Sequence, residues 1–193
     1  MKKIIFVIMA LTCCLGFNSC SDDDWDYDHS LENVYFFGPE VWGYDATKKG
    51  SNNVVHYEIP QGEIVEIPMQ FWCEFIRDYD VTTYYWVNNV VKDQDTQLVR
   101  GRDYEIVDAN GQPIQPDADG AWSMVWPNAK MGVQNIFIKA LGGNKGTFYL
   151  QTFNPASSVE LSNQNVESTI QSQTKDYTVR IFTQNYRVTI NIQ

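Results

Sequence analysis

The chain has 193 residues, and its 24 Asp and Glu outnumber its 14 Lys and Arg, which gives a formal net charge of −10. Phosphate groups are bound by clustered Lys and Arg side chains, and the sequence contains no such cluster, so we expect no nucleic-acid partner. The length is that of one domain with a substantial core of its own.

The N-terminal segment has the layout of a secretory signal peptide. Lys2 and Lys3 give it a positive start, and residues 4–15 form an apolar run that is too short to cross a hydrocarbon core of about 30 Å as a helix. A buried N-terminal helix is the alternative, but the run has no polar face to meet solvent. We predict that residues 1–19 are removed. Their loss takes away two of the 14 basic and none of the 24 acidic residues, and the net charge becomes −12.

Cys20 directly follows the small residue Ser19. This junction resembles the signal of bacterial lipoproteins, in which the cysteine becomes the first residue after cleavage and carries the acyl chains. Phe17 and Asn18 depart from the residues that are commoner in that signal. The resemblance implies that Cys20 is a palmitate-bearing lipid anchor and that its partner is the lipid of the outer membrane. Several acyl chains together hold a protein stably in a bilayer.

The residues after Cys20 read "SDDDWDYDHS". Residues 20–32 are predicted to be a solvated tether, because so polar a segment cannot bury enough apolar surface to order itself. A cysteine followed by Ser21 and the cluster Asp22, Asp23 and Asp24 also resembles the surface-export signal of Bacteroidetes-type lipoproteins. That resemblance implies that the domain faces the cell exterior, and a plain tether is the alternative.

Strand signals dominate the rest of the chain. β-branched and aromatic residues alternate with polar ones, and turn residues such as Pro60, Gly62 and Gly111 separate the runs. The pattern predicts one all-β domain over residues 33–193, an immunoglobulin-like antiparallel β-sandwich. The predicted strands are 33–37, 53–59, 64–76, 81–91, 102–107, 121–126, 133–141, 147–153, 177–182 and 186–192, while 159–173 is a loop, a weak strand or a helical turn.

The cysteine inventory predicts a fold held by packing alone. Cys13 and Cys14 leave with the signal peptide and Cys20 carries the lipid, so Cys73 remains as a single thiol and no intramolecular disulfide can form. The alternation of residues 64–76 places Cys73 on the apolar face of its strand, where a free cysteine acts as a small hydrophobe.

The sequence offers no recognisable catalytic or metal-binding set. His56 stands alone on a strand face, and a zinc site needs three or four His, Cys or carboxylate ligands. The densest carboxylate pairs, Asp93 with Asp95 and Asp117 with Asp119, lie in segments that we interpret as solvated turns. We therefore predict that the protein is not an enzyme and uses no cofactor or metal, with a small hydrolase as the least favoured alternative.

Three elements of residues 98–155 occur in a characteristic order: a Gly-x-Asp-Tyr step, a strand that ends in Pro before a small-residue turn, and an Ile-rich strand. This order resembles the immunoglobulin-like sandwich modules related to Calx-beta. Similar modules occur in uncharacterised lipoproteins encoded near starch-utilisation-type glycan importers, which implies an accessory role in glycan use. The paired acidic loops that bind calcium in true Calx-beta domains are not evident. The residues concerned are Gly101, Asp103 and Tyr104, then Trp126, Pro127 and Ala129, then Ile136 and Ile138.

Aromatic residues supply the candidate binding site. Trp72 interrupts the polar face of the strand 64–76, and Trp86 shares a face with Tyr84 in the next strand. If these two strands pair as a hairpin, the three rings become neighbours on one sheet face. Such a flat platform suits a glycan, whereas ordinary core packing of the aromatic residues is the alternative.

These features predict a non-catalytic, surface-exposed lipoprotein that serves as an accessory or glycan-binding module. The alternative is an adhesin or cell-surface assembly subunit that pairs strand edges with a neighbouring surface protein, which the regular terminal strand 186–192 favours.

Overall fold

The computed structural model describes residues 32–42, 55–157 and 169–193, which belong to one compact unit over residues 31–193. In these ranges the chain forms β-strands and a 3₁₀ turn at Pro127–Ala129. None of the described residues belongs to a helix that is long and apolar enough to cross a membrane. The predicted signal peptide, Cys20 and the acidic run Ser21 to Asp24 lie outside the described residues and stay predictions.

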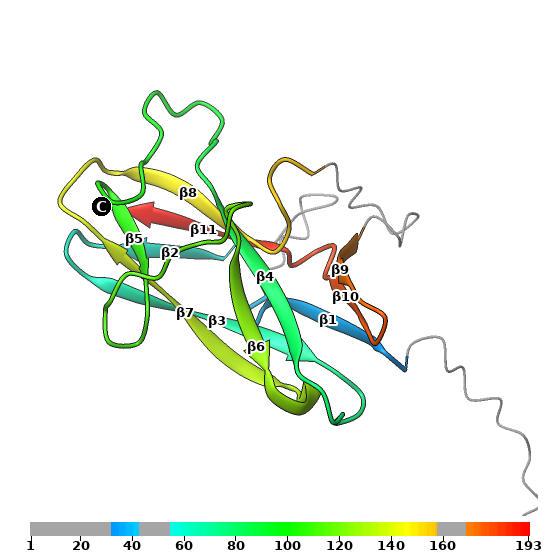
Figure 1. The fold of residues 1–193 in the computed structure, drawn as a ribbon. Helices are drawn as coiled ribbons and strands as arrows, with labels where there is room; N and C mark the ends of the chain where they lie inside the picture. Colours follow the sequence, from blue (N-terminus) through cyan, green and yellow to red (C-terminus); the bar gives the residue numbers. More distant parts are fainter. Residues whose placement is uncertain (1–31, 43–54, 158–168) are drawn as a thin grey trace, which may run out of the picture. The chain divides into compact units, whose positions relative to one another are not determined.

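The strands pack as two layers (Figure 1). Their bounds are β1 Val34–Pro39, β2 His56–Ile59, β3 Ile64–Trp72, β4 Val81–Asn88, β5 Tyr104–Val107, β6 Trp122–Trp126, β7 Gly132–Ala140, β8 Gly146–Gln151, β9 Ile170–Gln173, β10 Thr178–Ile181 and β11 Arg187–Ile192. The six-stranded sheet has the order β5-β7-β3-β1-β10-β9, and the five-stranded sheet has the order β2-β11-β8-β4-β6. The prediction of an all-β sandwich is confirmed.

Strand pairing is mixed rather than purely antiparallel. β1 pairs with β10 in parallel, and β2 pairs with β11 in parallel, while the other pairs in the two sheets are antiparallel. Parallel neighbours require a long crossover, and each of these pairs joins a strand near the start of the domain to one near its end. The two ends of the domain are thereby held in both sheets.

The strand predicted over residues 64–76 ends at Trp72. The alternation stops there, because Cys73 is half-buried against the core and Phe75 is exposed. The next residues are held by other elements, since the backbone N–H of Arg77 donates to the carbonyl of Asn128 at 2.8 Å. Residues 73–80 therefore form a connection between the sheets and not a continuation of β3.

Aromatic rings join the two sheets at the centre of the sandwich. The ring of Trp126 on β6 lies 5.1 Å from that of Phe71 on β3, nearly parallel, and 6.3 Å from that of Phe37 on β1. Its indole N–H donates to the hydroxyl of Thr83 at 2.9 Å, which satisfies the one polar atom of a buried ring. Trp122, Met124 and Trp126 all face the core.

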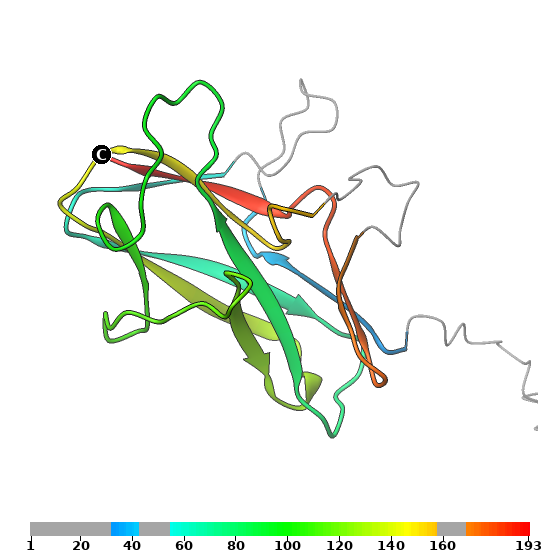
Figure 2. The same ribbon diagram turned by 45° about the horizontal axis from the view of Figure 1, so that its top comes forward.

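The edge of β4 that faces away from β6 is completed by a side chain of β9 and by Tyr177, the residue before β10. β8 pairs with β4 only from Trp86 onwards, which leaves Thr82 and Tyr84 without a backbone partner on that side. The Gln171 amide accepts from Tyr84 N at 2.8 Å and donates to Tyr84 O at 2.7 Å, and the Tyr177 hydroxyl accepts from Thr82 N at 3.2 Å. A side chain thus takes the place of a strand and links the two sheets there. Figure 2 shows the hairpin of β9 and β10, in orange, alongside β4.

Hydrogen bonds to Asp103 connect the Gly-x-Asp-Tyr turn with the loop that precedes β8. Its fully buried carboxylate accepts hydrogen bonds from the backbone N–H groups of Val99 at 2.7 Å and Asn144 at 2.6 Å, and from the guanidinium of Arg102 at 2.7 and 2.9 Å. A Cβ atom at position 143 would collide with this carboxylate, which explains Gly143. The bond from Arg102 and the two backbone donors hold the pKa of Asp103 well below its usual range.

We predict that Asp103→Asn lowers the free energy of unfolding by about 2–4 kcal/mol at pH 7, because an amide nitrogen cannot accept from the buried donors. The native pKa is depressed, so this contribution is complete above the unfolded-state pKa of about 3.9 and declines as the pH falls below it. Denaturant titrations at pH 7 and pH 2.5 measure the difference between the two proteins. The exposed Asp119→Asn is the control and should change stability by less than about 0.5 kcal/mol. A difference that stays the same at both pH values would contradict this role.

Candidate binding surface

The three aromatic residues proposed as one platform lie on different sheets. Trp72 ends β3 in the six-stranded sheet, whereas Tyr84 and Trp86 belong to β4 in the five-stranded sheet. The hairpin of strands 64–76 and 81–91 on which the platform depended does not form, because the connection between them crosses from one sheet to the other and β3 pairs with β1 and β7 instead. No platform can combine Trp72 with the other two rings.

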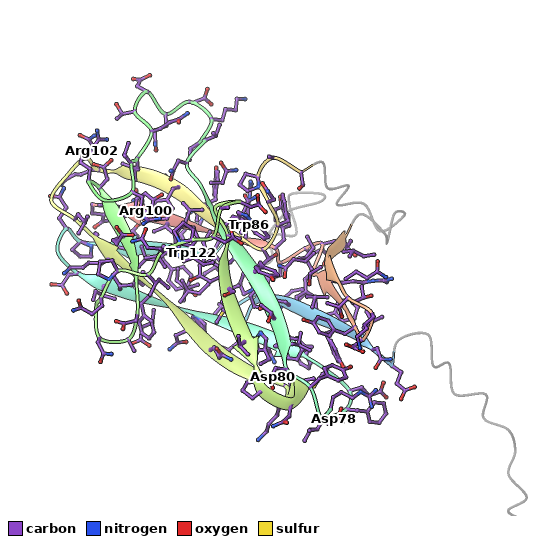
Figure 3. All side chains as sticks on the ribbon, in the orientation of Figure 1. Asp78, Asp80, Trp86, Arg100, Arg102 and Trp122 are labelled. Atoms are coloured by element: carbon purple, nitrogen blue, oxygen red, sulfur yellow. The ribbon has the colours of Figure 1, made fainter. Side chains whose placement is uncertain are left out.

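Tyr84 and Trp86 do form a pair on the outer face of the five-stranded sheet, with ring centroids 6.2 Å apart. Both are half-buried. On the same sheet, the guanidinium of Arg187 lies 4.4 Å from the ring centre of Tyr149. Figure 3 marks the position of Trp86. The rings of Tyr84 and Trp86 are both less exposed than that of Trp72.

Trp72 belongs instead to a row of four aromatic residues, which we call the aromatic strip: Phe36, Trp42, Trp72 and Phe182. Phe36 on β1 lies directly opposite Trp72 on β3 and stacks on Phe182 at 5.7 Å. Trp42 meets the ring of Phe182 edge-on at 5.3 Å. Trp72 is 44% exposed and Trp42 is 53% exposed, so the strip presents large aromatic faces to solvent.

A glycine and a buried amide position Phe182 in the strip. A Cβ atom at Gly38 would lie 2.7 Å from the ring of Phe182 and 2.7 Å from the carbonyl oxygen of Asn185. The buried side chain of Asn185 donates to the carbonyl of Pro39 at 2.5 Å, and its backbone N–H donates to the carbonyl of Phe182. The ring therefore rests on bare backbone of β1, where any side chain would displace it.

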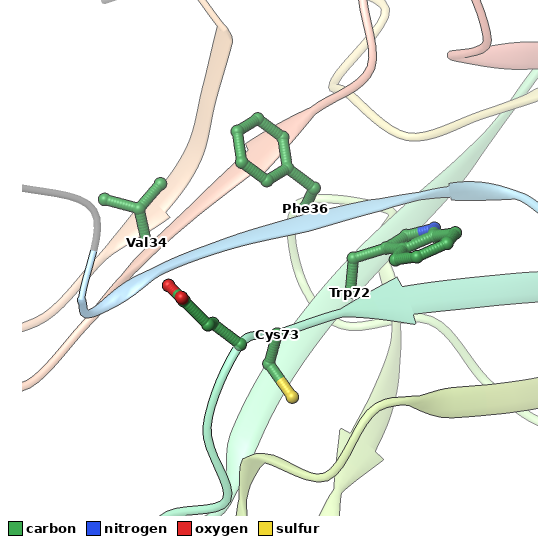
Figure 4. Close-up of a pocket in the computed structure, with 5 residues that line it drawn as sticks. Val34, Phe36, Trp72 and Cys73 are labelled. Carbon is green, nitrogen blue, oxygen red and sulfur yellow. The ribbon is translucent and has the colours of Figure 1, made fainter.

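A groove of about 250 Å³ opens beside the strip (Figure 4). Val34, Phe36, Trp72, Cys73 and Glu74 line it, and Figure 4 shows the rings of Phe36 and Trp72 rising from neighbouring strands. Burial raises the pKa of the Cys73 thiol, so it stays protonated near neutral pH. The groove is thus largely apolar with one carboxylate at its rim.

Polar side chains flank the strip on the same face of the sheet. Gln70 lies opposite Gly38 on the neighbouring strand, and Arg180 lies beside Phe36 in the parallel pair of β1 and β10. Residues opposite each other in a sheet point to the same face. Together with Glu74, which lines the groove, these residues place an amide, a cation and a carboxylate near the strip.

His56 and Cys73, which were also singled out from the sequence, do not lie in a common site. His56 is exposed on β2 in the five-stranded sheet, whereas Cys73 follows β3 in the other sheet. Within the described ranges, no three His, Cys, Asp or Glu side chains form a group that could hold a metal ion.

Sequence reasoning found Trp72 but missed the other rings of the strip. Phe36 was within reach, because Tyr35 and Phe37 on either side of it are core residues and an alternating strand must turn Phe36 outward. Trp42 and Phe182 follow the ends of β1 and β10, where no alternation predicts a side-chain direction. In the sequence, Gly38 is the residue that indicates where Phe182 packs. The reason for a glycine at this position became clear only from the fold.

Comparisons with known proteins give no family. The chain matches no known family model and no curated protein. Among solved structures it is similar to that of AvmM, which catalyses macrocyclization in alchivemycin A biosynthesis, with 13% identity and a TM-score of 0.31 over 83% of this chain and 89% of that one. A likeness at this level assigns neither a fold nor a reaction to this chain.

One prediction from the sequence is corrected by this comparison. The chain was predicted not to be an enzyme, whereas a solved structure to which it is similar belongs to an enzyme. That prediction is contradicted and we withdraw it.

We predict that Gly38→Ala lowers the free energy of unfolding by about 1–3 kcal/mol, because the new methyl group overlaps the Phe182 ring and a backbone oxygen. Gly132→Ala is the matched control, since it lies in the same sheet and a Cβ there meets nothing within 4 Å. Denaturant unfolding of the two variants measures the difference. Equal stability of both would show that Phe182 does not rest on Gly38.

Proposed function

We propose that this protein is a lipid-anchored protein of the outer membrane, facing the cell exterior, and that its β-sandwich binds carbohydrate through the aromatic strip. The observation that carries the binding proposal is the row formed by Trp72, Phe36, Phe182 and Trp42, in which both tryptophans are about half exposed.

The chemistry of the strip suits sugar rings. The C–H groups on the apolar face of a sugar pack on flat aromatic rings, whose faces carry negative charge. Large aromatic side chains exposed together on a soluble domain are a feature of binding surfaces. Gln70, Glu74 and Arg180 beside the strip supply donors and acceptors for sugar hydroxyls. The excess of acidic residues disfavours anionic polysaccharides, so the ligand class is a neutral glycan.

The proposed location rests on the N-terminal segment. The resemblance of the sequence up to Cys20 to a lipoprotein signal supports the anchor, and Ser21 with Asp22, Asp23 and Asp24 supports export to the surface. The resemblance of residues 98–155 to Calx-beta-like modules supports an accessory role in glycan use.

The second candidate function is an adhesin or assembly subunit that pairs strand edges. The strand that first suggested it, β11, lies between β2 and β8 and is paired on both sides, so its edges are occupied. The observation that favours this candidate is instead the free edge of β6.

We predict that the protein binds a neutral polysaccharide and that Trp72→Ala weakens this binding at least about tenfold, a loss of about 1.4 kcal/mol. The reason is the removal of an exposed ring from one end of the strip. A glycan array identifies the ligand, and tryptophan-fluorescence titrations measure the affinity.

Tyr84→Ala serves as the matched control, because it removes a ring from the outer face of the opposite sheet. The affinity of this variant for the polysaccharide should stay within about twofold of that of the unsubstituted protein. If no glycan binds, or if Trp72→Ala binds as well as Tyr84→Ala, the strip is not a carbohydrate site.

We predict that Cys20→Ala leaves the precursor uncleaved and without label from a palmitate analogue, because the modified sulfur is lost. Replacing Asp22, Asp23 and Asp24 by Ala should keep the lipid but reduce protease access to the protein on whole cells. Labelling of Cys20→Ala would place the anchor at another cysteine, and unchanged protease access in the aspartate variant would leave the acidic run as a plain tether.

A further inference from the structure

The free edge of β6 differs from the other sheet edges. The sheets end at β5, β9, β2 and β6. The backbone of β5 is occupied, because Ile106 O accepts from Ile114 N at 3.0 Å. β9 pairs with β10 through a register shift, and β2 carries the charge of Glu58. Irregular pairing and charge are the usual protections of an edge strand, and the sequence of β6, "WSMVW", has no charge and no proline.

Backbone groups of β6 point out from this edge. Val125 O accepts a hydrogen bond from the side-chain amide of Gln134 on β7 at 2.8 Å, so its carbonyl points away from β4. The N–H of a strand residue points to the same side as its carbonyl, which directs Val125 N outward as well. Thr82 and Tyr84, opposite Val125 and Ser123, point their backbone groups away from β6, in agreement with this register.

A groove of about 370 Å³ lies along this edge, between β6 of one sheet and β7 of the other. β5 pairs with β7 only as far as Phe137. Along the same edge of β7, the backbone of Val133 and Asn135 has no neighbouring strand in the described part of the chain. The side chain of Val125, which lines the groove, is 48% exposed. The groove therefore offers backbone hydrogen bonds along its walls and apolar side chains at its rim.

The charge around the groove is negative. The sequence has no Lys or Arg between Asp103 and Ala129, the stretch that contains β5, the following loop and β6. Arg100 lies 5.6 Å from the Trp122 ring centre at the start of β6 (Figure 3), but its guanidinium is paired with Glu105 at 2.7 Å. Of the carboxylates in this stretch, Asp108 lines the groove, and Asp117 accepts from the backbone N–H of Ala121 directly before β6.

We propose that β6 binds an extended, basic segment of a partner polypeptide, which adds to the five-stranded sheet as a sixth strand. A strand satisfies a row of backbone donors and acceptors, and lysine or arginine side chains at alternate positions match the acidic surroundings. While the site is empty, the side-chain amide of Gln134 donates to the carbonyl of Val125. When the partner strand binds, one of its backbone N–H groups takes the place of this amide. This site is independent of the aromatic strip and of carbohydrate binding.

The test uses the full-length protein in detergent and a peptide of about eight residues that alternates valine and lysine, the length of an ordinary strand. Calorimetry measures affinity, and amide hydrogen exchange reports on Ser123 and Val125. We expect binding together with slower exchange at these two amides. Val125→Pro removes only the outward N–H, which edge strands tolerate, and should weaken binding at least about tenfold. Val125→Thr keeps the N–H and the branched shape and should bind within about twofold of the unsubstituted protein.

Two further peptides test the partner chemistry without altering the protein. A peptide with glutamate in place of lysine, and one with N-methyl groups on alternate backbone nitrogens, should each bind at least about tenfold more weakly. The proposal is overturned if the valine–lysine peptide does not bind, if either control peptide binds equally well, or if Val125→Pro binds as well as Val125→Thr. It is also overturned if sedimentation shows a dimer that Val125→Pro dissociates, because a second copy then occupies the edge.

Discussion

The contact of Trp126 with Phe71 between the two sheets fixes the orientation of the strands on which both proposed surfaces depend. Side chains alternate along a strand, so a ring that faces inward determines where its neighbours point. With Phe71 in the core, Trp72 must face solvent, and with Trp126 in the core, Val125 must do the same. The buried hydrogen bond from the Trp126 indole to Thr83 fixes the position of β6 against β4 and so the direction of its free backbone groups. A shift of one residue in either strand would exchange core and surface side chains.

The assignment of strands to sheets decides which exposed residues can act together. Consecutive strands often pair, and that expectation placed Trp72 beside Trp86. The chain instead crosses between the sheets after β3, where Arg77 bonds to Asn128 and residue 32, so Trp72 gains its neighbours from β1 and from the residue after β10. A parallel pair between strands at opposite ends of the domain, β1 and β10, is therefore what assembles the aromatic strip.

The two surfaces differ in the chemistry that they offer. The strip presents ring faces with few free backbone groups, since β3 and β1 are paired on both sides, and this suits a ligand with apolar faces and hydroxyl groups. The edge of β6 presents backbone donors and acceptors in an acidic setting, which suits an extended basic polypeptide. The strip lies on the six-stranded sheet, whereas the free strand edge belongs to β6 of the five-stranded sheet.

The sequence by itself determined the all-β sandwich, most of the strand positions and the inward faces of strands such as 122–126, because alternation and turn residues are local properties. It also singled out Trp72 as an aromatic residue on a polar face. It did not determine which strands are neighbours, since pairing depends on contacts between residues far apart in the chain. Only the tertiary structure therefore brought Phe182 onto Gly38 and beside Phe36, ended β3 at Trp72, and left β6 at an edge with Val125 N pointing outward.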